Sequence, residues 1–186
     1  MKRIDAIRCI SKLLTDEPVV VSLGHPAYDL YAAGDRPLNF YTWGSMGLTT
    51  SIALGLALAC PDRRIVALDG DGSLLMNLGS LATIGAGAPP NLLIVVLDNG
   101  VHGTTGGQHT ATAGKADLEG VARAVGIAQA RTVRDEAALE AVLRESRGSA
   151  GPWMVVAKVR ESSPAAKPPL DCVFIKHRFM AALCNL

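Results

Sequence analysis

The amino-acid sequence predicts an α/β fold in three layers, with a mainly parallel, doubly wound sheet between helices on both faces. Short apolar runs alternate along the chain with longer segments of helical periodicity. The run 92–97 is aliphatic without a break, as expected for a central parallel strand that is covered on both faces. Because strands that alternate with helices are typical of parallel sheets, we expect one domain over residues 1–186.

The first third of the chain predicts a helix, a strand, a loop and a second helix. Apolar residues recur at helical spacing over 4–14, and a strand is expected at 19–21. Glycine and proline then favour a loop that includes 24–26 and 34–37. The segment 44–60 consists mainly of small and aliphatic residues on every side, which predicts a helix that is buried all round.

The rest of the chain repeats the pattern of strand, turn and helix. Asp117 and Asp135 are expected to cap the helices that follow them. A loop rich in Gly and Thr is expected at 101–114, and a Pro-rich linker at 164–169. The expected strands lie at 65–68, 92–97, 127–133 and 153–159. The expected helices begin near Ser73, Leu118, Asp135 and Asp171, the first stopped by Pro89-Pro90 and the last ending at about 184.

Composition and charge argue against several classes of protein. The formal net charge is +1, and no basic stripe is present that would attract phosphate backbones or anionic lipids. The four cysteines form no CxxC pair and no zinc spacing with histidine, so we expect reduced thiols in a cytoplasmic protein. Charged residues interrupt the apolar start that a signal peptide needs, and the apolar run 52–60 is shorter than the ~20 residues of a membrane span. We therefore expect neither nucleic acid nor a membrane as a partner.

Two polar turns, 70–73 and 98–100, follow two of the predicted strands. Ligands of open parallel sheets bind beyond the carboxyl ends of the strands, so both turns would face one crevice if the strands are neighbours. Asp71 offers a carboxylate and Asn99 a carbonyl oxygen, which are hard ligands suited to Mg²⁺. The glycines on either side of Asp71 leave room for phosphates, and a helix that begins near Ser73 would direct free N–H groups toward them. The two turns predict a site for a metal-bound diphosphate.

Other interpretations of the first turn make different demands on the sequence. A Gly-Asp-Gly turn alone is also typical of a plain turn, and only the second turn favours a binding site. A Rossmann fingerprint needs glycine where Leu75 stands. A calcium loop that starts at Asp69 needs glycine where Leu74 stands and glutamate where Ser80 stands. The sequence therefore speaks against a dinucleotide site and a calcium loop.

The segment Gly70-Asp71-Gly72, followed after a helix and a strand by Asp98-Asn99, resembles the signature of thiamine diphosphate (ThDP) enzymes, in which GDG precedes an Asn-Asn pair. Asp98 replaces the first Asn of that pair, whereas the family's metal ligand is the second. The resemblance implies the ThDP-binding fold. It also implies an Mg²⁺ ion held by Asp71, Asn99 and the backbone oxygen of Val101.

Further segments are similar to the β subunit of sulfopyruvate decarboxylase and to the C-terminal domain of phosphonopyruvate decarboxylase, namely 39–41, 44–47, 75–79 and 102–108. By this match, the Gly44 carbonyl would accept a hydrogen bond from the aminopyrimidine ring of ThDP, and Met46 would be the apolar wedge that bends the cofactor. The cofactor-binding residues implied by the resemblance are Gly24, His25, Gly44, Ser45, Met46, Gly70, Asp71, Gly72, Ser73, Asn99, Val101, His102 and Gly103.

The roles of the loop histidines stay open at this point. His25 follows the first strand, where related enzymes place a small or hydroxyl residue against the diphosphate, so it would either donate a hydrogen bond there or be an ordinary loop residue. His102 would assist an anionic substrate or a proton transfer, since imidazole titrates near neutrality, or would be purely structural. The sequence assigns no role to His109.

The resemblance implies the diphosphate-binding subunit of a 2-oxoacid decarboxylase that acts on a small anionic substrate, first of all 3-sulfopyruvate, to give sulfoacetaldehyde and CO₂. The family's catalytic glutamate belongs to a pyrimidine-binding domain that this sequence does not match, so we expect an α-type partner chain, with the helix at 44–60 as a candidate contact surface. Phosphonopyruvate decarboxylase and an acetolactate synthase-like subunit are alternative functions. A regulatory protein that keeps the fold without catalysis is another.

Overall fold

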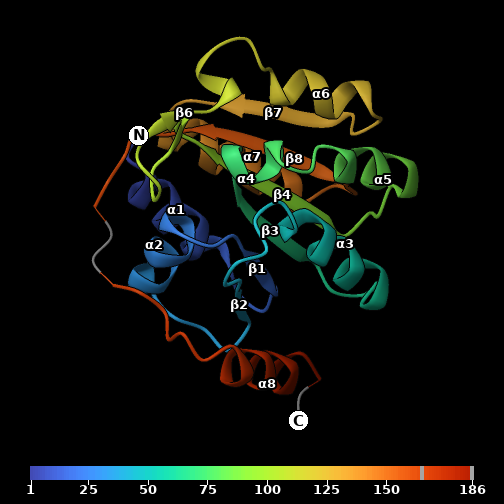
Figure 1. The fold of residues 1–186 in the computed structure, drawn as a ribbon. Helices are drawn as coiled ribbons and strands as arrows, with labels where there is room; N and C mark the ends of the chain where they lie inside the picture. Colours follow the sequence, from blue (N-terminus) through green and yellow to red (C-terminus); the bar gives the residue numbers. More distant parts are fainter. Residues whose placement is uncertain (164–165, 185–186) are drawn as a thin grey trace.

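The computed structural model describes residues 1–163 and 166–184 and shows an open sheet with helices on both faces (Figure 1). The six-stranded sheet has the order β2-β1-β3-β4-β8-β7, and every neighbouring pair is parallel. Its strands are β1 Val19–Val21, β2 Asn39–Tyr41, β3 Ile65–Gly70, β4 Leu92–Asp98, β7 Gln129–Val133 and β8 Trp153–Lys158. The predicted fold class is confirmed. Of the predicted linker at 164–169, residues 164 and 165 lie outside the described part of the chain.

The helices divide between the two faces because side chains of a strand alternate in direction. In β4, Leu93 and Val95 face one apolar cluster, and Ile94 and Val96 face the other. The first cluster is covered by α1 Arg3–Leu13, α2 His25–Ala33 and α7 Glu136–Arg147. The second is covered by α3 Thr49–Ala59, α4 Asp71–Leu75, α5 Gly79–Gly87 and α6 Leu118–Ala124. A central strand that is buried on both sides explains the unbroken aliphatic run that identified it.

Two predictions for the first third of the chain are wrong. The expected loop around 24–37 contains α2, because Pro26 stands in the first turn of that helix, where its missing N–H leaves no hydrogen bond unmade. The expected helix at 44–60 begins only at Thr49, since Gly44 and Gly47 have φ values of 73° and 88° that a helix does not allow. It is not buried all round either, because the side chain of Leu58 is 64% exposed.

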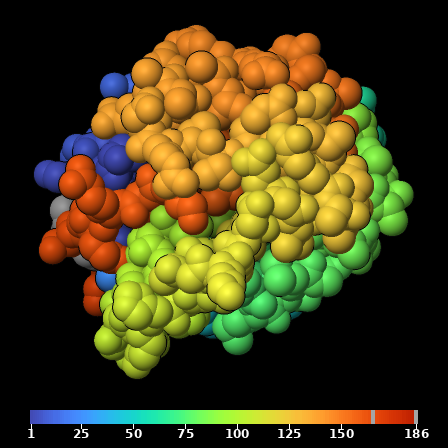
Figure 2. Space-filling view, turned by 90° about the horizontal axis from the view of Figure 1, so that it is seen from above, coloured from blue at the N-terminus to red at the C-terminus, as the bar shows by residue number. Residues whose placement is uncertain are grey.

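Two further segments differ from prediction. The helix expected after the first polar turn is divided into α4 and α5, so Asp71 begins a helix of only five residues. The loop expected at 101–114 contains a short antiparallel hairpin, formed by β5 Val101–His102 and β6 Gln108–His109, and a 3₁₀ turn at Ala111–Ala113. Figure 2 shows this yellow-green hairpin segment standing out at the edge of the molecule.

The terminal helix α8, Cys172–Cys184, packs back on the edge of the sheet beside β2, as Figure 1 shows. Phe179 contacts Phe40 with ring centroids 5.3 Å apart, and Arg178 forms an ion pair with Asp35 at 2.5 Å. Within residues 1–163 and 166–184, none of the helices combines the length and the apolar character needed to span a membrane.

The contact between α5 and the turn after α6 yields a stability prediction. A Cβ atom at Gly85 would lie 1.9 Å from the backbone oxygen of Val125, which cannot move without shifting the turn. We expect Gly85→Ala to lower the free energy of unfolding by about 3 kcal/mol, at the upper end of the cost of overpacking. Gly87→Ala in the same helix has open space at its Cβ and is expected to change stability by at most ~1 kcal/mol. Urea denaturation measures both, and equal effects would contradict this packing.

Candidate functional site

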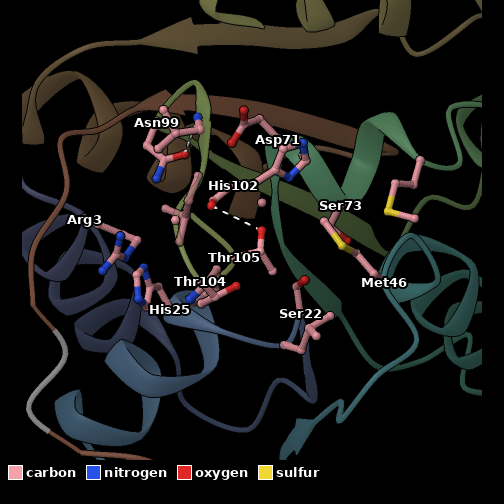
Figure 3. A pocket seen from close by; sticks show the side chains of 18 of the residues that line it. Arg3, Ser22, His25, Met46, Asp71, Ser73, Asn99, His102, Thr104 and Thr105 are labelled. Atoms are coloured by element: carbon pink, nitrogen blue, oxygen red, sulfur yellow. Dashed lines mark hydrogen bonds between the residues drawn. The ribbon is translucent and has the colours of Figure 1, made fainter. Parts of the chain in front are cut away.

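A cavity of about 410 Å³ lies beyond the carboxyl ends of β1, β3 and β4, between the first turn of α2 and the β5–β6 hairpin (Figure 3). Most of the residues singled out in the sequence line it, namely His25, Met46, Gly70, Asp71, Gly72, Ser73, Asn99, Val101, His102 and Gly103. The two polar turns therefore face one cavity, as their positions after neighbouring strands predict.

Three of the expected residues lie outside this lining. Gly24 precedes α2 with φ 79°, and a Cβ there would lie 3.1 Å from the Thr104 side chain. Gly44 and Ser45 are exposed in a left-handed loop, with φ values of 73° and 53°. These two residues are next to Met46, which does reach the cavity and is 38% exposed.

Asp71 is held by one of its two carboxylate oxygens. Its Oδ2 accepts a hydrogen bond from the hydroxyl of Thr110 at 2.5 Å and lies 2.8 Å from the hydroxyl of Thr112. The Thr112 hydroxyl also lies 2.8 Å from Oδ1 of Asp98. Because the threonines contact only Oδ2, Oδ1 is the Asp71 oxygen that stays available to a ligand in the cavity.

Asp98 stands where the related enzymes have asparagine, and the structure shows how its charge is compensated. Its side chain is almost completely buried, and a buried carboxylate without a partner is costly. The ammonium group of Lys158, at the end of the neighbouring strand β8, lies 2.5 Å from its Oδ2. The ion pair and the Thr112 hydroxyl together anchor the second polar turn beneath the cavity.

The side chain of Asn99 is fixed at both ends of its amide. Its nitrogen donates a hydrogen bond to Oε1 of Glu161, and its oxygen accepts one from the backbone N–H of Val101 at 3.2 Å. Figure 3 shows the Asn99 oxygen on the side of the amide that faces Asp71. The two candidate metal ligands therefore present oxygen atoms toward the same part of the cavity.

The histidines differ in their surroundings. The ring of His102 lies so close to the first turn that a Cβ at Gly72 would be 2.5 Å from its Cε1, so the glycine is required for this approach. His25 lies with its Nδ1 3.4 Å from Glu161. Its pKa is below the ordinary value, first because burial and then because the charge of Arg3 disfavour the cation. His109 is exposed on β6 and is absent from the cavity lining.

Sequence reasoning missed several residues of this site, because no local pattern marks them. Arg3, near the start of the chain, lines the cavity. Its Nη1 donates a hydrogen bond to Glu161, which follows β8 near the other end of the chain. Partial burial acts to raise the pKa of Glu161, but the hydrogen bond and charge of Arg3, together with His25 and Asn99, outweigh it, so the pKa is below its usual value. Burial raises the pKa of Asp69, directly before Gly70, to about 6. Ser22, Thr104, Thr105 and Gln108 also contribute polar side chains to the lining.

The donors present fit a diphosphate with Mg²⁺. Asp71 and Asn99 offer oxygen atoms, which Mg²⁺ prefers, and Mg²⁺ commonly takes its remaining ligands from phosphates and water. No cluster of three or more His, Cys, Asp or Glu side chains that could bind a metal alone occurs among the described residues. A Cβ at Gly70 would meet no atom within 4 Å, so a phosphate has room to approach the backbone there.

Comparison with known proteins agrees with this geometry. Residues 24–157 match the family model described as thiamine pyrophosphate enzyme, C-terminal TPP binding domain. The sulfopyruvate decarboxylase subunit beta of Methanocaldococcus jannaschii is 40% identical, over 98% of this chain and 97% of that relative. The phosphonopyruvate decarboxylase of Streptomyces viridochromogenes is also 40% identical, over 94% of this chain and 44% of that relative.

Among solved structures, a putative thiamin diphosphate-dependent enzyme from Mycobacterium smegmatis has a similar fold. The TM-score is 0.72 at 24% identity, and the match covers 88% of this chain and 32% of that one. At this identity the likeness concerns the fold alone. The family match and the relatives that align over nearly the whole chain show that the protein belongs to the thiamine pyrophosphate enzymes, in the family of their C-terminal TPP-binding domain.

Proposed function

We propose that the chain is the diphosphate-binding subunit of a ThDP- and Mg²⁺-dependent decarboxylase that converts 3-sulfopyruvate to sulfoacetaldehyde and CO₂. The observation that carries the proposal is the pair of oxygen ligands, Asp71 and Asn99, at the ends of adjacent strands in a cavity large enough for part of the cofactor. Relatives named as sulfopyruvate decarboxylase subunit beta, similar over nearly the whole chain, support the choice of substrate. The free thiols of the described cysteines agree with a cytoplasmic location.

The residues of this chain have distinct tasks in the proposed reaction. ThDP, when bound, supplies the carbon nucleophile and takes up the electrons released with CO₂. Asp71, Asn99 and the backbone of Val101 hold the metal and through it the diphosphate. Met46 gives apolar support next to the cavity, and His102 lies where it can hold or move a proton near the metal turn. The hairpin that carries His102 forms one wall of the cavity.

The anionic end of the substrate requires a cation that this chain does not supply freely. Arg3 is the one Lys or Arg among the described residues of the cavity lining. Its guanidinium already donates to Asp29, Glu161 and the backbone oxygen of Ser162. We therefore assign recognition of the sulfonate mainly to a partner chain. Phosphonopyruvate, the substrate named for a relative that is 40% identical over 94% of this chain, is the alternative substrate.

An exposed apolar surface is the place where we expect an α-type, pyrimidine-binding partner. The helix α3 contacts both α4 and α5, and the three helices carry Asp71 as their single charged residue. Leu58 and Met76 are each 64% exposed, and Leu48 is 45% exposed. Met76 also lines the cavity, so this surface reaches the mouth of the site. A partner that covers it would bury apolar area and close the cavity in one step.

The first test is CO₂ release by the chain assembled with the partner chain from its own cells, supplied with ThDP and Mg²⁺. We expect release from sulfopyruvate, with less or none from phosphonopyruvate and pyruvate. Asp71→Ala removes a metal ligand and is expected to lower the rate at least about a hundredfold, because even residues that only orient ligands cost 10–100-fold. Asp62→Ala, an exposed aspartate before β3, is the matched control. A stable, cofactor-loaded complex without release from any substrate would contradict the decarboxylase.

The partner surface has its own test. Leu58→Glu places a charge on the exposed face of α3, so the chain should still fold, whereas an unpaired charge in a covered interface is costly. We expect the affinity for the partner chain to fall at least about tenfold. Val173→Glu on α8 makes the same change at a side chain that is 66% exposed and is expected to leave binding unaltered. Calorimetric titration measures both, and the reverse result would place the partner on α8.

A further inference from the structure

Glu161 collects donors from three separate elements of the structure. Its Oε2 accepts a hydrogen bond from Arg3 of α1 at 2.8 Å and lies 3.4 Å from Nδ1 of His25, in the first turn of α2. Its Oε1 accepts one from the amide nitrogen of Asn99, in the turn after β4. Figure 3 shows Arg3, His25 and Asn99 on one side of the cavity. The carboxylate of Glu161 therefore joins the start of the chain to the second polar turn.

The space around Glu161 shows that this contact is closely fitted. A Cβ at Gly103 would lie 2.9 Å from Oε1 of Glu161 and 3.1 Å from Nδ1 of His25. The hairpin thus crosses the carboxylate at a position where only glycine fits without a shift. Arg3, which is 2% exposed and also donates to Asp29 and Ser162, holds the other carboxylate oxygen in place. Glu161 is itself 44% exposed, so its position results from these contacts and not from burial in the core.

The contact with Asn99 decides which end of an amide faces the metal position. The amide of asparagine has one oxygen, which accepts, and one nitrogen, which donates, and the two ends have nearly the same shape. An ionised carboxylate only accepts, so Glu161 can be satisfied only by the nitrogen. With the nitrogen turned to Glu161, the oxygen faces Val101 and Asp71. The opposite rotation would direct N–H groups at a bound cation.

We propose that Glu161 is a positioning residue that orients the Asn99 oxygen toward Mg²⁺, a role that rests on the metal site of the proposed function. The backbone N–H of Val101 favours the same orientation from within the turn. The carboxylate of Glu161, 62 positions away along the chain, fixes the other end of the amide. Glu161 is not a metal ligand in this role. It acts through Asn99 and makes the site ready before the ion binds.

The test measures the Mg²⁺ concentration that half-saturates ThDP binding, by equilibrium dialysis of the chain assembled with its partner. We expect Glu161→Ala to raise this concentration at least about tenfold, the range seen when a group that orients a metal ligand is lost. Glu161→Gln keeps an oxygen that can accept from Asn99 and is expected to stay within about twofold of the unchanged protein. Glu145→Ala, an exposed glutamate of α7, is the control for loss of charge. An equal rise of the half-saturating Mg²⁺ concentration in Glu161→Ala and Glu161→Gln would overturn the orienting role.

A second variant separates orientation from any general effect on the fold. In Asn99→Asp both side-chain oxygens can bind the ion, so no choice between nitrogen and oxygen remains. We expect Glu161→Ala in that background to leave the half-saturating Mg²⁺ concentration unchanged or to lower it, because two adjacent carboxylates also repel each other. A rise as large as in the Asn99 background would contradict the inference.

If Asp71→Ala abolishes Mg²⁺-dependent binding while Glu161→Ala has no effect, the metal site stands and the role of Glu161 fails. Binding of ThDP that is independent of Mg²⁺ in the unchanged protein would overturn the proposed metal site as well.

Discussion

The parallel pairing of β3 with β4 is the constraint on which the rest of the site depends. Asp69 pairs with Val96 and Gly70 with Leu97, so the two strands run in register to their carboxyl ends. In a parallel pair the chain must leave both strands at the same edge of the sheet, which places the two polar turns side by side. Neither turn alone makes a metal site. The register of a fully buried strand brings their oxygen ligands into one cavity.

The buried charge at the end of β4 has to be compensated, and the residues that compensate it anchor the turn beneath the cavity. Asp98 is neutralised by Lys158, which the pairing of β4 with β8 holds opposite it. The hydroxyls of Thr110 and Thr112 then link this ion pair to Asp71. Asp71 keeps one free oxygen because the network uses only the other. An acidic residue in place of the family's first asparagine is therefore compatible with the same geometry, since a lysine on the neighbouring strand balances its charge.

Local signals in the sequence differ in how well they predict the structure. Asp117, expected to cap α6, makes no side-chain capping hydrogen bond there. The aliphatic run of β4 and the cap of α7, where Asp135 accepts from the Ala138 N–H, could be read directly from the residues. Pro26 favours a loop because proline breaks most helices, yet it is tolerated in the first turn of a helix, where the structure places it. No local pattern could have placed Arg3 or Glu161 in the site, because their contact spans 158 positions and follows from the bridge between Lys2 and Arg160.

The proposed function requires a metal-bound diphosphate between the ends of β3 and β4. The most direct measurement is a crystal structure of the assembled protein with ThDP and Mn²⁺ in place of Mg²⁺, in which anomalous scattering locates the ion. We expect one strong peak at an ion bonded to the side-chain oxygens of Asp71 and Asn99, with the diphosphate against Gly70. An ion at another position, or a diphosphate bound without either side chain as a ligand, would contradict this expectation.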